Sequence, residues 1–249
     1  ESGLRLTLGA YTTPREAYGE IIPRFVESWK AETGQTVSFE ESYLGSGAQS
    51  RAVVGGFEAD VVALSLAADV ERIAEAGLIS HPWSERPYGG MVSTSVVVMA
   101  VREGNPLGIR DWRDLARPGL EILTPDPKTS GGAQWNVLAM FGAAQRGRVE
   151  GYAASEAGGA DFLEAVFRNV TVLDKAARES ITNYEKGVGD VAITYENEVL
   201  VGRQKGQDYD YVIPSSTILI ENPAAIVDAN VDRHGTREVA EAFLAFLAS

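Results

Sequence analysis

Ser130, Gly131 and Gly132 have the side chains and the position of an anion-binding helix start. They follow a proline-containing loop at 125–129 and precede an amphipathic run. A serine at this point can cap the helix or donate its hydroxyl to a ligand, and glycines let a guest approach the backbone closely. The first N–H groups of a helix have no acceptor within it, so they are available to an anion. A plain helix cap is the alternative, although two glycines within a helix cost about 1 kcal/mol each.

Three further segments place small or hydroxyl residues at predicted helix starts. They are residues 11–16, which contain Thr12, then Gly45-Ser46-Gly47, and residues 176–180, which contain Arg178. Taken alone, each is more simply an ordinary cap. The first two follow predicted strands, as Ser130 does, and the carboxyl ends of strands are where open α/β sheets bind ligands. Arg178 either faces such a pocket or is a charge on the surface or behind the site.

Strand and helix patterns alternate along almost the whole chain, which is typical of an α/β fold with largely parallel sheets. The expected strands are 4–8, 37–41, 60–64, 93–102, 121–123, 170–173, 191–195, 211–214 and 224–227. The expected helices are 14–33, 45–54, 67–76, 112–115, 131–146, 161–167, 180–186, 196–203 and 236–247. Pro23 predicts a kink or a break within the first of these helices.

The length of 249 residues and the hydrophobic content of 45% are sufficient for two lobes with full cores. A proline-rich stretch before Gly89-Gly90 indicates that the chain crosses between lobes there. We expect residues 1–88 and 198–249 to form lobe I, which is discontinuous, and residues 89–197 to form lobe II.

The charge balance limits the partners that this chain can bind. With 35 acidic and 22 basic residues, the formal net charge is −13, whereas nucleic acids and anionic membranes both need a basic face. The absence of cysteine excludes disulfides, thiolate metal sites and a cysteine nucleophile. A run of about 18 apolar residues, which could span a membrane, does not occur. Because no cluster of Lys and Arg stands out, an anion site must use dipoles and neutral donors.

The sequence gives little support to catalysis. Ser46 and Ser130 both lack the G-x-S-x-G frame of a nucleophile elbow. The two histidines, His81 and His234, lie in expected loops and are interpreted as surface residues, since a base or a metal site needs other groups nearby. We therefore expect neither a metal nor another cofactor.

Tyr195 carries the remaining enzymatic alternative. It ends a predicted buried strand and could point its hydroxyl into a cleft. An enzyme acting on an oxyanion ester would use Tyr195 together with Glu196 or Asp190. Scattered acids are expected in so acidic a chain, so a binding role is favoured.

Several segments along nearly the whole chain resemble the sulfate/thiosulfate-binding proteins of bacterial ABC importers. They are residues 11–16, 45–47, 58–64, 102–106, 111–115, 125–136, 189–198 and 231–237. The most specific is Thr129-Ser130-Gly131-Gly132-Ala133, followed by Trp135-Asn136. The resemblance implies a two-lobed class II periplasmic-binding-protein fold. In that fold each lobe is a sheet flanked by helices, and the ligand binds in the cleft between the lobes.

The resemblance also implies how such a site holds sulfate without a contacting cation. The donors would be Ser46, through its hydroxyl and its N–H, and from the other lobe Ser130, Gly131, Gly132 and the N–H of Ala177. Arg178 matches an arginine that lies behind the anion and couples to the local dipoles.

Two positions depart from the family's pattern. Thr12 stands where the family usually has Asp, and its contact with the anion would be a backbone N–H. Tyr195 stands where the family has a tryptophan that donates to sulfate, and a phenol can also accept a hydrogen bond whereas an indole only donates. Hydrogen phosphate carries a proton that needs an acceptor, and Tyr195 can supply one. Tyr195 therefore weakens the discrimination of the site against phosphate in favour of sulfate. Sulfate is expected, with thiosulfate, phosphate or molybdate as alternatives.

The resemblance implies a binding protein rather than an enzyme, working outside the cytoplasmic membrane. Its partners would be a small inorganic oxyanion and the membrane permease of an ABC importer, with no nucleic acid and no insertion into the membrane. We expect an exported protein and a monomer; the chain opens on Glu1-Ser2-Gly3, as a mature domain would after removal of a leader, which is compatible with export. The family normally continues beyond the position of Leu247.

Overall fold

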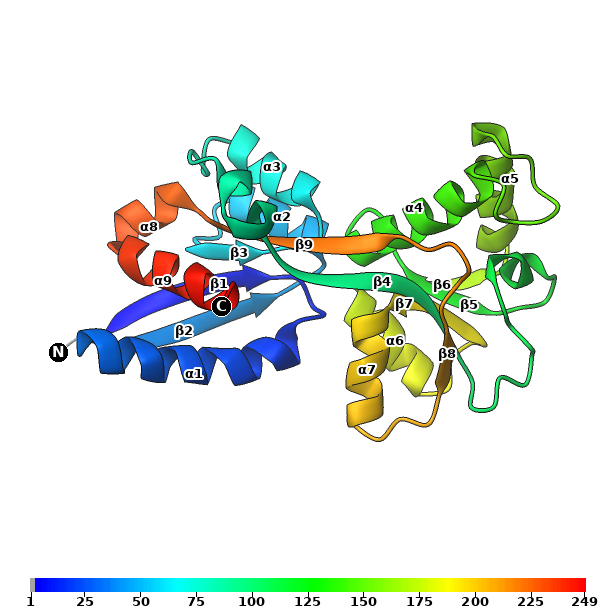
Figure 1. The fold of residues 1–249 in the computed structure, drawn as a ribbon, viewed down its shortest axis with the longest axis horizontal. Helices are drawn as coiled ribbons and strands as arrows, with labels where there is room; N and C mark the ends of the chain where they lie inside the picture. Colours follow the sequence, from blue (N-terminus) through cyan, green and yellow to red (C-terminus); the bar gives the residue numbers. More distant parts are fainter. Residues whose placement is uncertain (1–2) are drawn as a thin grey trace. The chain divides into compact units, whose positions relative to one another are not determined.

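The computed structural model describes residues 3–249, which form two compact units. Unit 1 contains the residues up to Thr94 and the segment Glu221–Ser249, and unit 2 contains Ser95–Ile220. Each unit is an α/β body with its own sheet (Figure 1). The chain passes between the units twice, within strands β4 (Met91–Val101) and β9 (Leu219–Ile226).

The sheet of unit 1 has the order β2-β1-β3-β9. Strands β1 (Leu4–Ala10), β2 (Val37–Tyr43) and β3 (Val61–Ala63) are parallel, and β9 runs antiparallel to β3. Its helices are α1 (Arg15–Thr33), α2 (Ser46–Val54), α3 (Ala67–Glu75), α8 (Asp228–His234) and α9 (Arg237–Leu247). Short 3-10 turns at Trp83–Glu85 and Pro87–Gly90 lead into β4.

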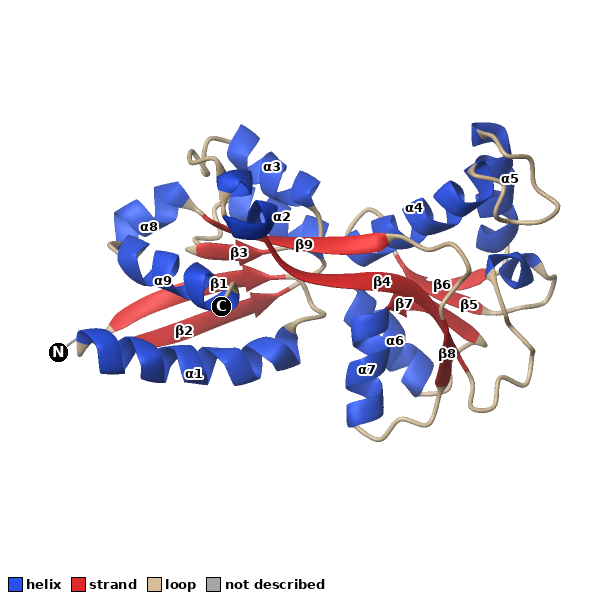
Figure 2. Ribbon diagram, viewed as in Figure 1, coloured by secondary structure: helices blue, strands red, loops and turns tan. Residues whose placement is uncertain are grey.

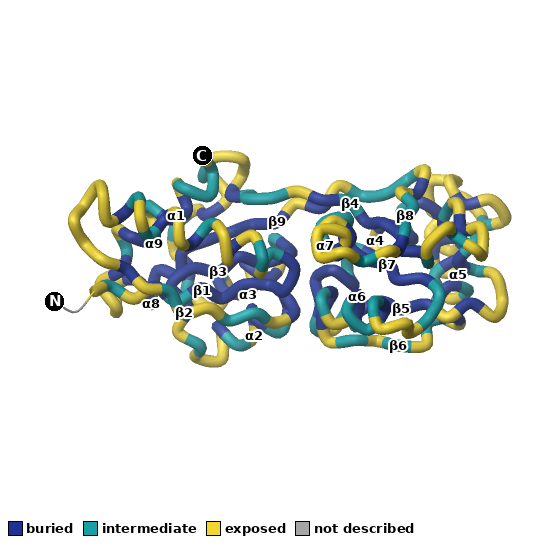
Figure 3. Tube along the Cα trace, turned by 90° about the horizontal axis from the view of Figure 1, so that it is seen from below, coloured by how far each residue is buried: buried dark blue, intermediate teal, exposed yellow. Residues whose placement is uncertain are grey.

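Successive side chains of the strands in unit 1 point to opposite faces of the sheet, so its hydrophobic core has one part on each face. Leu6 and Leu8 of β1 pack with α1 and α9, whereas Val62 of β3 packs with residues of α2 and α3. Helices therefore cover both faces, as Figure 2 shows for α1 on one side and α2 and α3 on the other. Strands β1 and β3 are largely buried, the edge strand β2 is only partly covered, and the outer faces of the helices are exposed (Figure 3).

The sheet of unit 2 repeats the strand order of unit 1. Strands β5 (Ile122–Pro125), β6 (Val170–Asp174) and β7 (Val191–Tyr195) are parallel, in the order β6-β5-β7. Next to β7 lies β4, which is antiparallel to it and also pairs with β8 (Asp210–Val212). The helices are α4 (Gly131–Gln145), α5 (Glu156–Phe167), α6 (Ala177–Glu185) and α7 (Glu196–Gln204), with a 3-10 turn at Trp112–Ala116. In both units a central parallel strand is flanked by two others, and an antiparallel strand completes the path.

Most expected elements are present, with several local differences, among them the unexpected helix α8 and the start of β9 at Leu219 instead of 224. The helix expected from residue 161 begins at Glu156, because the Ser155 hydroxyl accepts a hydrogen bond from Gly158 and caps it. The helix expected from residue 180 begins at Ala177. Pro23 lies inside α1, on its exposed side, and does not break the helix, whose opposite side is buried in the core.

The boundaries of the compact units differ from the expected lobes. The first passage lies at 94/95 instead of 88/89, and the second at 220/221 instead of 197/198. Residues 198–220 belong to unit 2 because Val199 of α7 packs in its core and β8 pairs with Met99–Val101 of β4. The helix that follows Tyr195 thus lies within unit 2.

Both histidines tie α8 to the rest of unit 1; His234 is exposed, as expected of a surface residue, and His81 is half-buried. His81 Nδ1 lies 2.7 Å from Oδ2 of Asp228, the first residue of α8. His234, the last residue of α8, has Nδ1 2.7 Å from Oδ1 of the buried Asp60. The side chains of His81 and His234 are 23% and 26% exposed.

The His234–Asp60 contact makes stability depend on pH. The hydrogen bond to Asp60 raises the pKa of His234 above its ordinary 6.5. A raised folded-state pKa gives stability that is complete below pH 6.5 and is lost as the pH rises through the folded-state value. We expect His234→Gln to lower the free energy of unfolding more at pH 5.5 than at pH 8.5, as measured by urea denaturation.

The neighbouring Arg233, which forms an exposed ion pair with Glu58, provides the control. Arginine keeps its charge over this range, so the effect of Arg233→Gln should be nearly constant from pH 5.5 to 8.5. An equally flat profile for His234→Gln would contradict the assigned role.

Candidate functional site

Unit 1 brings two of the predicted donors to one edge of its sheet. Helices α1, α2 and α3 each begin a few residues after β1, β2 and β3, so their N-termini lie at the carboxyl ends of parallel strands. Thr12 is 9% exposed in the loop between β1 and α1, and Ser46, the first residue of α2, is 1% exposed. The side-chain Nε2 of Gln49 in α2 donates to Ala10 O at 3.0 Å, and this bond holds the start of α2 against the end of β1.

The hydroxyl of Ser46 is engaged within unit 1. It donates to Oδ2 of Asp69 at 2.6 Å and accepts from the N–H of Ser65 at 2.9 Å. Asp69 is fully buried in the first turn of α3, and its other oxygen binds Arg72 Nη1 at 2.6 Å. The hydroxyl hydrogen therefore points to Asp69, and the donor that Ser46 offers a ligand is its N–H at the helix start.

Unit 2 contains the buried helix start that the sequence predicts. Ser130 is the N-cap of α4, and its Oγ accepts from the N–H of Ala133 at 3.3 Å. A lone pair accepts this bond, so the cap does not use the hydroxyl hydrogen. Gly131 and Gly132 are the first two residues of the helix, are buried, and have N–H groups without an acceptor in the helix itself. The start of α4 can thus present a hydroxyl and two amides to an anion.

Asn136 and Tyr195 fix the position of this helix start. Asn136 Nδ2 donates to Thr124 Oγ1 of β5 and to Ile193 O of β7, both at 3.0 Å. Tyr195, 2% exposed at the end of β7, lies against Gly132. A Cβ on Gly132 would be 2.7 Å from Cε2 of the tyrosine ring and 3.2 Å from its hydroxyl oxygen. A side chain at position 132 would collide with this ring unless the ring moved. The predicted site residues Gly132 and Tyr195 are therefore in contact.

Ala177 is the first residue of α6 and is 3% exposed, with no side chain capping the helix. Its N–H lacks an acceptor within the helix, as the family resemblance implies for a donor. The neighbouring Arg178 forms an ion pair with Glu198 of α7, Nε to Oε2 at 2.7 Å, with side chains 18% and 0% exposed. The positive charge beside this helix start is therefore balanced by a buried carboxylate.

The predicted residues form two sets. Thr12 and Ser46 belong to unit 1, and the others, Ser130, Gly131, Gly132, Ala177, Arg178 and Tyr195, belong to unit 2. Within each unit the set lies at the carboxyl ends of parallel strands, where helix dipoles favour negative charge. Each set can therefore contribute neutral donors to an oxyanion.

Of the two carboxylates in the enzymatic alternative, Asp190 lies far from Tyr195, whereas Glu196 follows it directly at the start of α7. Asp190 precedes β7 and Tyr195 ends it, so about 16 Å of extended strand separates them. Asp190 Oδ2 accepts the N–H of Glu121 at 2.9 Å, a bond that ties the amino end of the strand. Glu196 lies 3.4 Å from the hydroxyl of Tyr211.

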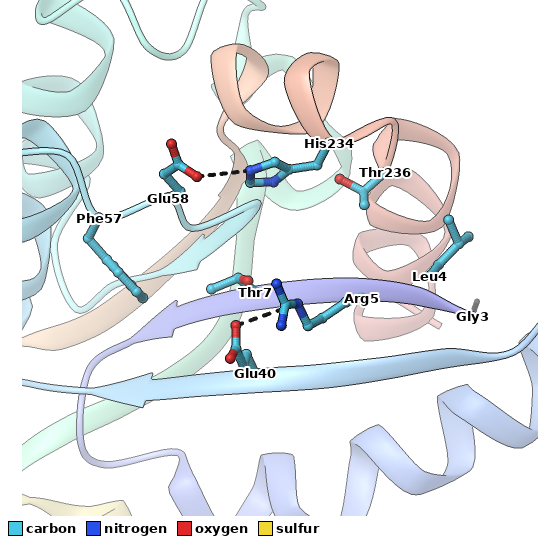
Figure 4. A pocket seen from close by; sticks show the side chains of 9 residues that line it. All are labelled: Gly3, Leu4, Arg5, Thr7, Glu40, Phe57, Glu58, His234 and Thr236. Carbon is cyan, nitrogen blue, oxygen red and sulfur yellow. Dashed lines mark hydrogen bonds and ion pairs between the residues drawn. The ribbon is translucent and has the colours of Figure 1, made fainter.

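A hollow of about 500 Å³ opens at the other end of the unit 1 sheet, near the start of β1 (Figure 4). Its charged side chains already pair with one another, His234 with Glu58 at 3.2 Å and Arg5 with Glu40 at 3.7 Å. None of the predicted donors lines this hollow. We therefore place the candidate site at the carboxyl ends of the strands instead.

Residues 3–249 contain neither a cluster of metal ligands nor a candidate membrane-spanning helix. No group of three or more His, Cys, Asp or Glu side chains in this range is arranged to hold a metal ion. Across the same range, none of the helices combines the length and the apolar character needed to cross a membrane.

Sequence reasoning missed the carboxylates behind the donors. Asp69 and Glu198 are both 1% exposed or less, and each binds an arginine. A signal for the first pair was present, because Asp69 and Arg72 are three residues apart in an expected helix, where side chains meet. Glu198 and Arg178 lie on different helices, and no local pattern indicates their contact.

Comparison with known proteins gave consistent matches over the whole chain. The family model described as bacterial extracellular solute-binding protein matches residues 6–249. A sulfate-binding protein of Synechococcus elongatus is 48% identical over 246 residues, which are 98% of this chain and 69% of that protein. A sulfate-binding protein of Escherichia coli is 44% identical over 244 residues, which are 96% of this chain and 73% of that protein.

A solved structure agrees with these matches. The sulfate-binding protein SubI from Mycobacterium tuberculosis superposes with a TM-score of 0.89 at 35% sequence identity. The superposition covers 99% of this chain and 82% of that chain.

The packing of Tyr195 on Gly132 can be tested by adding one methyl group. Gly132→Ala should lower the free energy of unfolding by about 1–2 kcal/mol, because overpacking outweighs the gain in helix propensity. A methyl group added at Gly142 in the same helix would have no atom within 4 Å, so Gly142→Ala should be neutral or stabilise by up to about 1 kcal/mol. Urea denaturation of the two variants measures the difference, and equal effects would contradict the close contact.

Proposed function

Because the chain belongs to the family of bacterial extracellular solute-binding proteins, we propose that it is an extracytoplasmic receptor that captures sulfate and delivers it to an ABC importer. The relatives from S. elongatus and E. coli, both named as sulfate-binding proteins, support sulfate as the ligand. The observation that carries the proposal is the buried start of α4, where Ser130, Gly131 and Gly132 present neutral donors fixed by Tyr195.

In the proposed mechanism, neutral donors of the kind present in each unit hold a dehydrated anion. The N–H groups of Ser46 and Ala177 act at helix starts, together with the three donors of α4. Thr12 contributes its backbone N–H, and Tyr195 contributes its hydroxyl. Removal of water from around the anion strengthens each hydrogen bond.

The proposed site uses dipoles instead of a contacting cation. The Arg72–Asp69 pair and the Arg178–Glu198 pair balance the charges nearest the helix starts. A sulfate oxygen accepts hydrogen bonds and donates none, so a set of N–H and O–H donors matches it. Tyr195 can also accept, and for this reason thiosulfate, phosphate and molybdate are the competing ligands.

We favour binding over catalysis as the role of this site. The Ser46 hydroxyl donates to Asp69, and the Ser130 oxygen accepts from Ala133 to cap α4. Both side chains therefore make structural hydrogen bonds. Asp190 lies at the far end of β7 from Tyr195. The competing proposal, an enzyme acting on an oxyanion ester, would show turnover of such an ester.

The family supports a proposal for the location and the partners. We place the protein outside the cytoplasmic membrane, in the periplasm or its equivalent, as a monomer that docks on the permease of an ABC importer. The net charge of −13 keeps it apart from nucleic acids and anionic lipid surfaces.

Titration calorimetry with sulfate, thiosulfate, phosphate and molybdate at equal ionic strength tests this proposal. Sulfate should bind most tightly, and its affinity should be nearly constant from about pH 5 to 8, because amides and hydroxyls do not titrate there. Tighter binding of another anion would change the assigned ligand. A steep loss of sulfate affinity that follows one titratable group would contradict the neutral-donor mechanism.

A further inference from the structure

We propose that Asn222 is a positioning residue that couples the strands joining the two units to the anion-binding start of α2. The inference rests on the proposed function, because it assigns α2 a role in binding sulfate. It concerns a residue of β9 that acts on the predicted donors through other residues. All the contacts that carry it lie within unit 1.

Asn222 lies where the chain passes between the units. The two passages are at 94/95 in β4 and at 220/221 in β9. Ser93 of β4 donates through its hydroxyl to Asn222 Oδ1 at 3.0 Å, so a side-chain hydrogen bond joins the two strands next to both passages. Asn222 is 1% exposed, and a buried amide in this place requires partners for its oxygen and its nitrogen.

The other end of the Asn222 amide reaches the loop after β3. Nδ2 donates to the carbonyl oxygen of Ser65 at 3.1 Å. The β3–β9 ladder ends nearby, where the N–H of Leu64 donates to Pro223 O at 2.9 Å. Ser65 is fully buried beyond the end of the ladder, so its carbonyl depends on a side chain.

The N–H of Ser65 continues the connection to α2. It donates to Ser46 Oγ at 2.9 Å, and the Ser46 hydroxyl in turn donates to Asp69 at 2.6 Å. Side chains thus hold both backbone groups of Ser65, Asn222 on one side and Ser46 on the other. The orientation of the first residue of α2 is therefore linked, bond by bond, to the strands between the units.

This connection has a mechanical consequence. Any rotation of the backbone near the two passages moves Asn222, and buried hydrogen bonds are costly to break, so Ser65 and Ser46 must follow. The N–H of Ser46 is the donor that unit 1 offers from α2. Asn222 therefore aligns this donor when the strands adopt their ligand-bound conformation.

Asn230 provides a matched control in the same unit. It is a second buried asparagine, 4% exposed, and its Nδ2 donates to a backbone carbonyl, Ala59 O, at 2.7 Å. Ala59 precedes β3, whereas Ser65 follows it. The two side chains make the same kind of bond at opposite ends of one strand, and only Asn222 leads to Ser46.

The first test compares sulfate affinities by titration calorimetry at a temperature where all variants are folded. Asn222→Ala should weaken binding about tenfold, as expected for a residue that modulates coupling without touching the ligand. Asn230→Ala should change the affinity by less than about twofold, since effects on distant sites are independent. Equal effects of the two substitutions would overturn the proposal.

The second test uses Asn222→Asp, which nearly preserves shape. The introduced carboxyl can still accept from Ser93, but when ionised it faces the carbonyl of Ser65 and repels it. Protonation restores a donor, so sulfate affinity of this variant should rise as the pH falls from about 7 to 5, because burial raises the pKa of a carboxyl. A flat profile, like that expected for the wild type, would contradict the role of the Nδ2 bond.

A measurement without ligand separates this inference from the proposed function. Amide hydrogen exchange at Ser65 and at the start of α2 should be faster in Asn222→Ala than in the wild type, and unchanged in Asn230→Ala. If the wild type fails to bind sulfate while the exchange pattern holds, the proposed ligand is wrong and the connection stands. If sulfate binds and exchange at these residues is unaffected, the connection is wrong.

Discussion

The backbone N–H at the start of a helix is the constraint on which this structure depends. A helix leaves its first amides without internal acceptors, and burying them is unfavourable unless something else accepts. In both units parallel strands bring several such starts to one sheet edge, with Ser46, Gly131 and Ala177 buried there. Small side chains at these positions leave the amides accessible. In the proposed function, an oxyanion is the acceptor that satisfies them.

The charged side chains near these amides pair with one another, behind the helix starts. The buried carboxylates Asp69 and Glu198 each pair with an arginine, so the helix starts lie beside neutral pairs in a chain whose net charge is −13. Direct contact with a lysine or arginine would bind many anions through charge alone. Hydrogen-bond donors in fixed directions instead select by shape and by protonation state, which suits a receptor that must choose among tetrahedral anions.

Short-range patterns predicted the α/β class, most elements and the start of α4, because caps and glycines act within a few residues. The solved relative confirms the fold class. The partners of these residues could not be predicted in the same way. Asp69 is 23 residues from Ser46, and Asn222 is 157 residues from Ser65, and such pairs depend on strand register and helix packing. The second unit boundary was misplaced for the same reason, since the pairing of β8 with β4 has no local signal.

Unit 1 is assembled from both ends of the chain, and this has a consequence for how the protein forms. Strand β3 gains its antiparallel neighbour only when residues 224–226 are available to pair with Val61–Ala63. During synthesis from the N-terminus, unit 2 is complete while the edge of β3 is still bare, and an uncovered edge is prone to wrong pairing. Pairing of β9 with β3 therefore completes the strand order β2-β1-β3-β9 of unit 1 only after unit 2 has been synthesised.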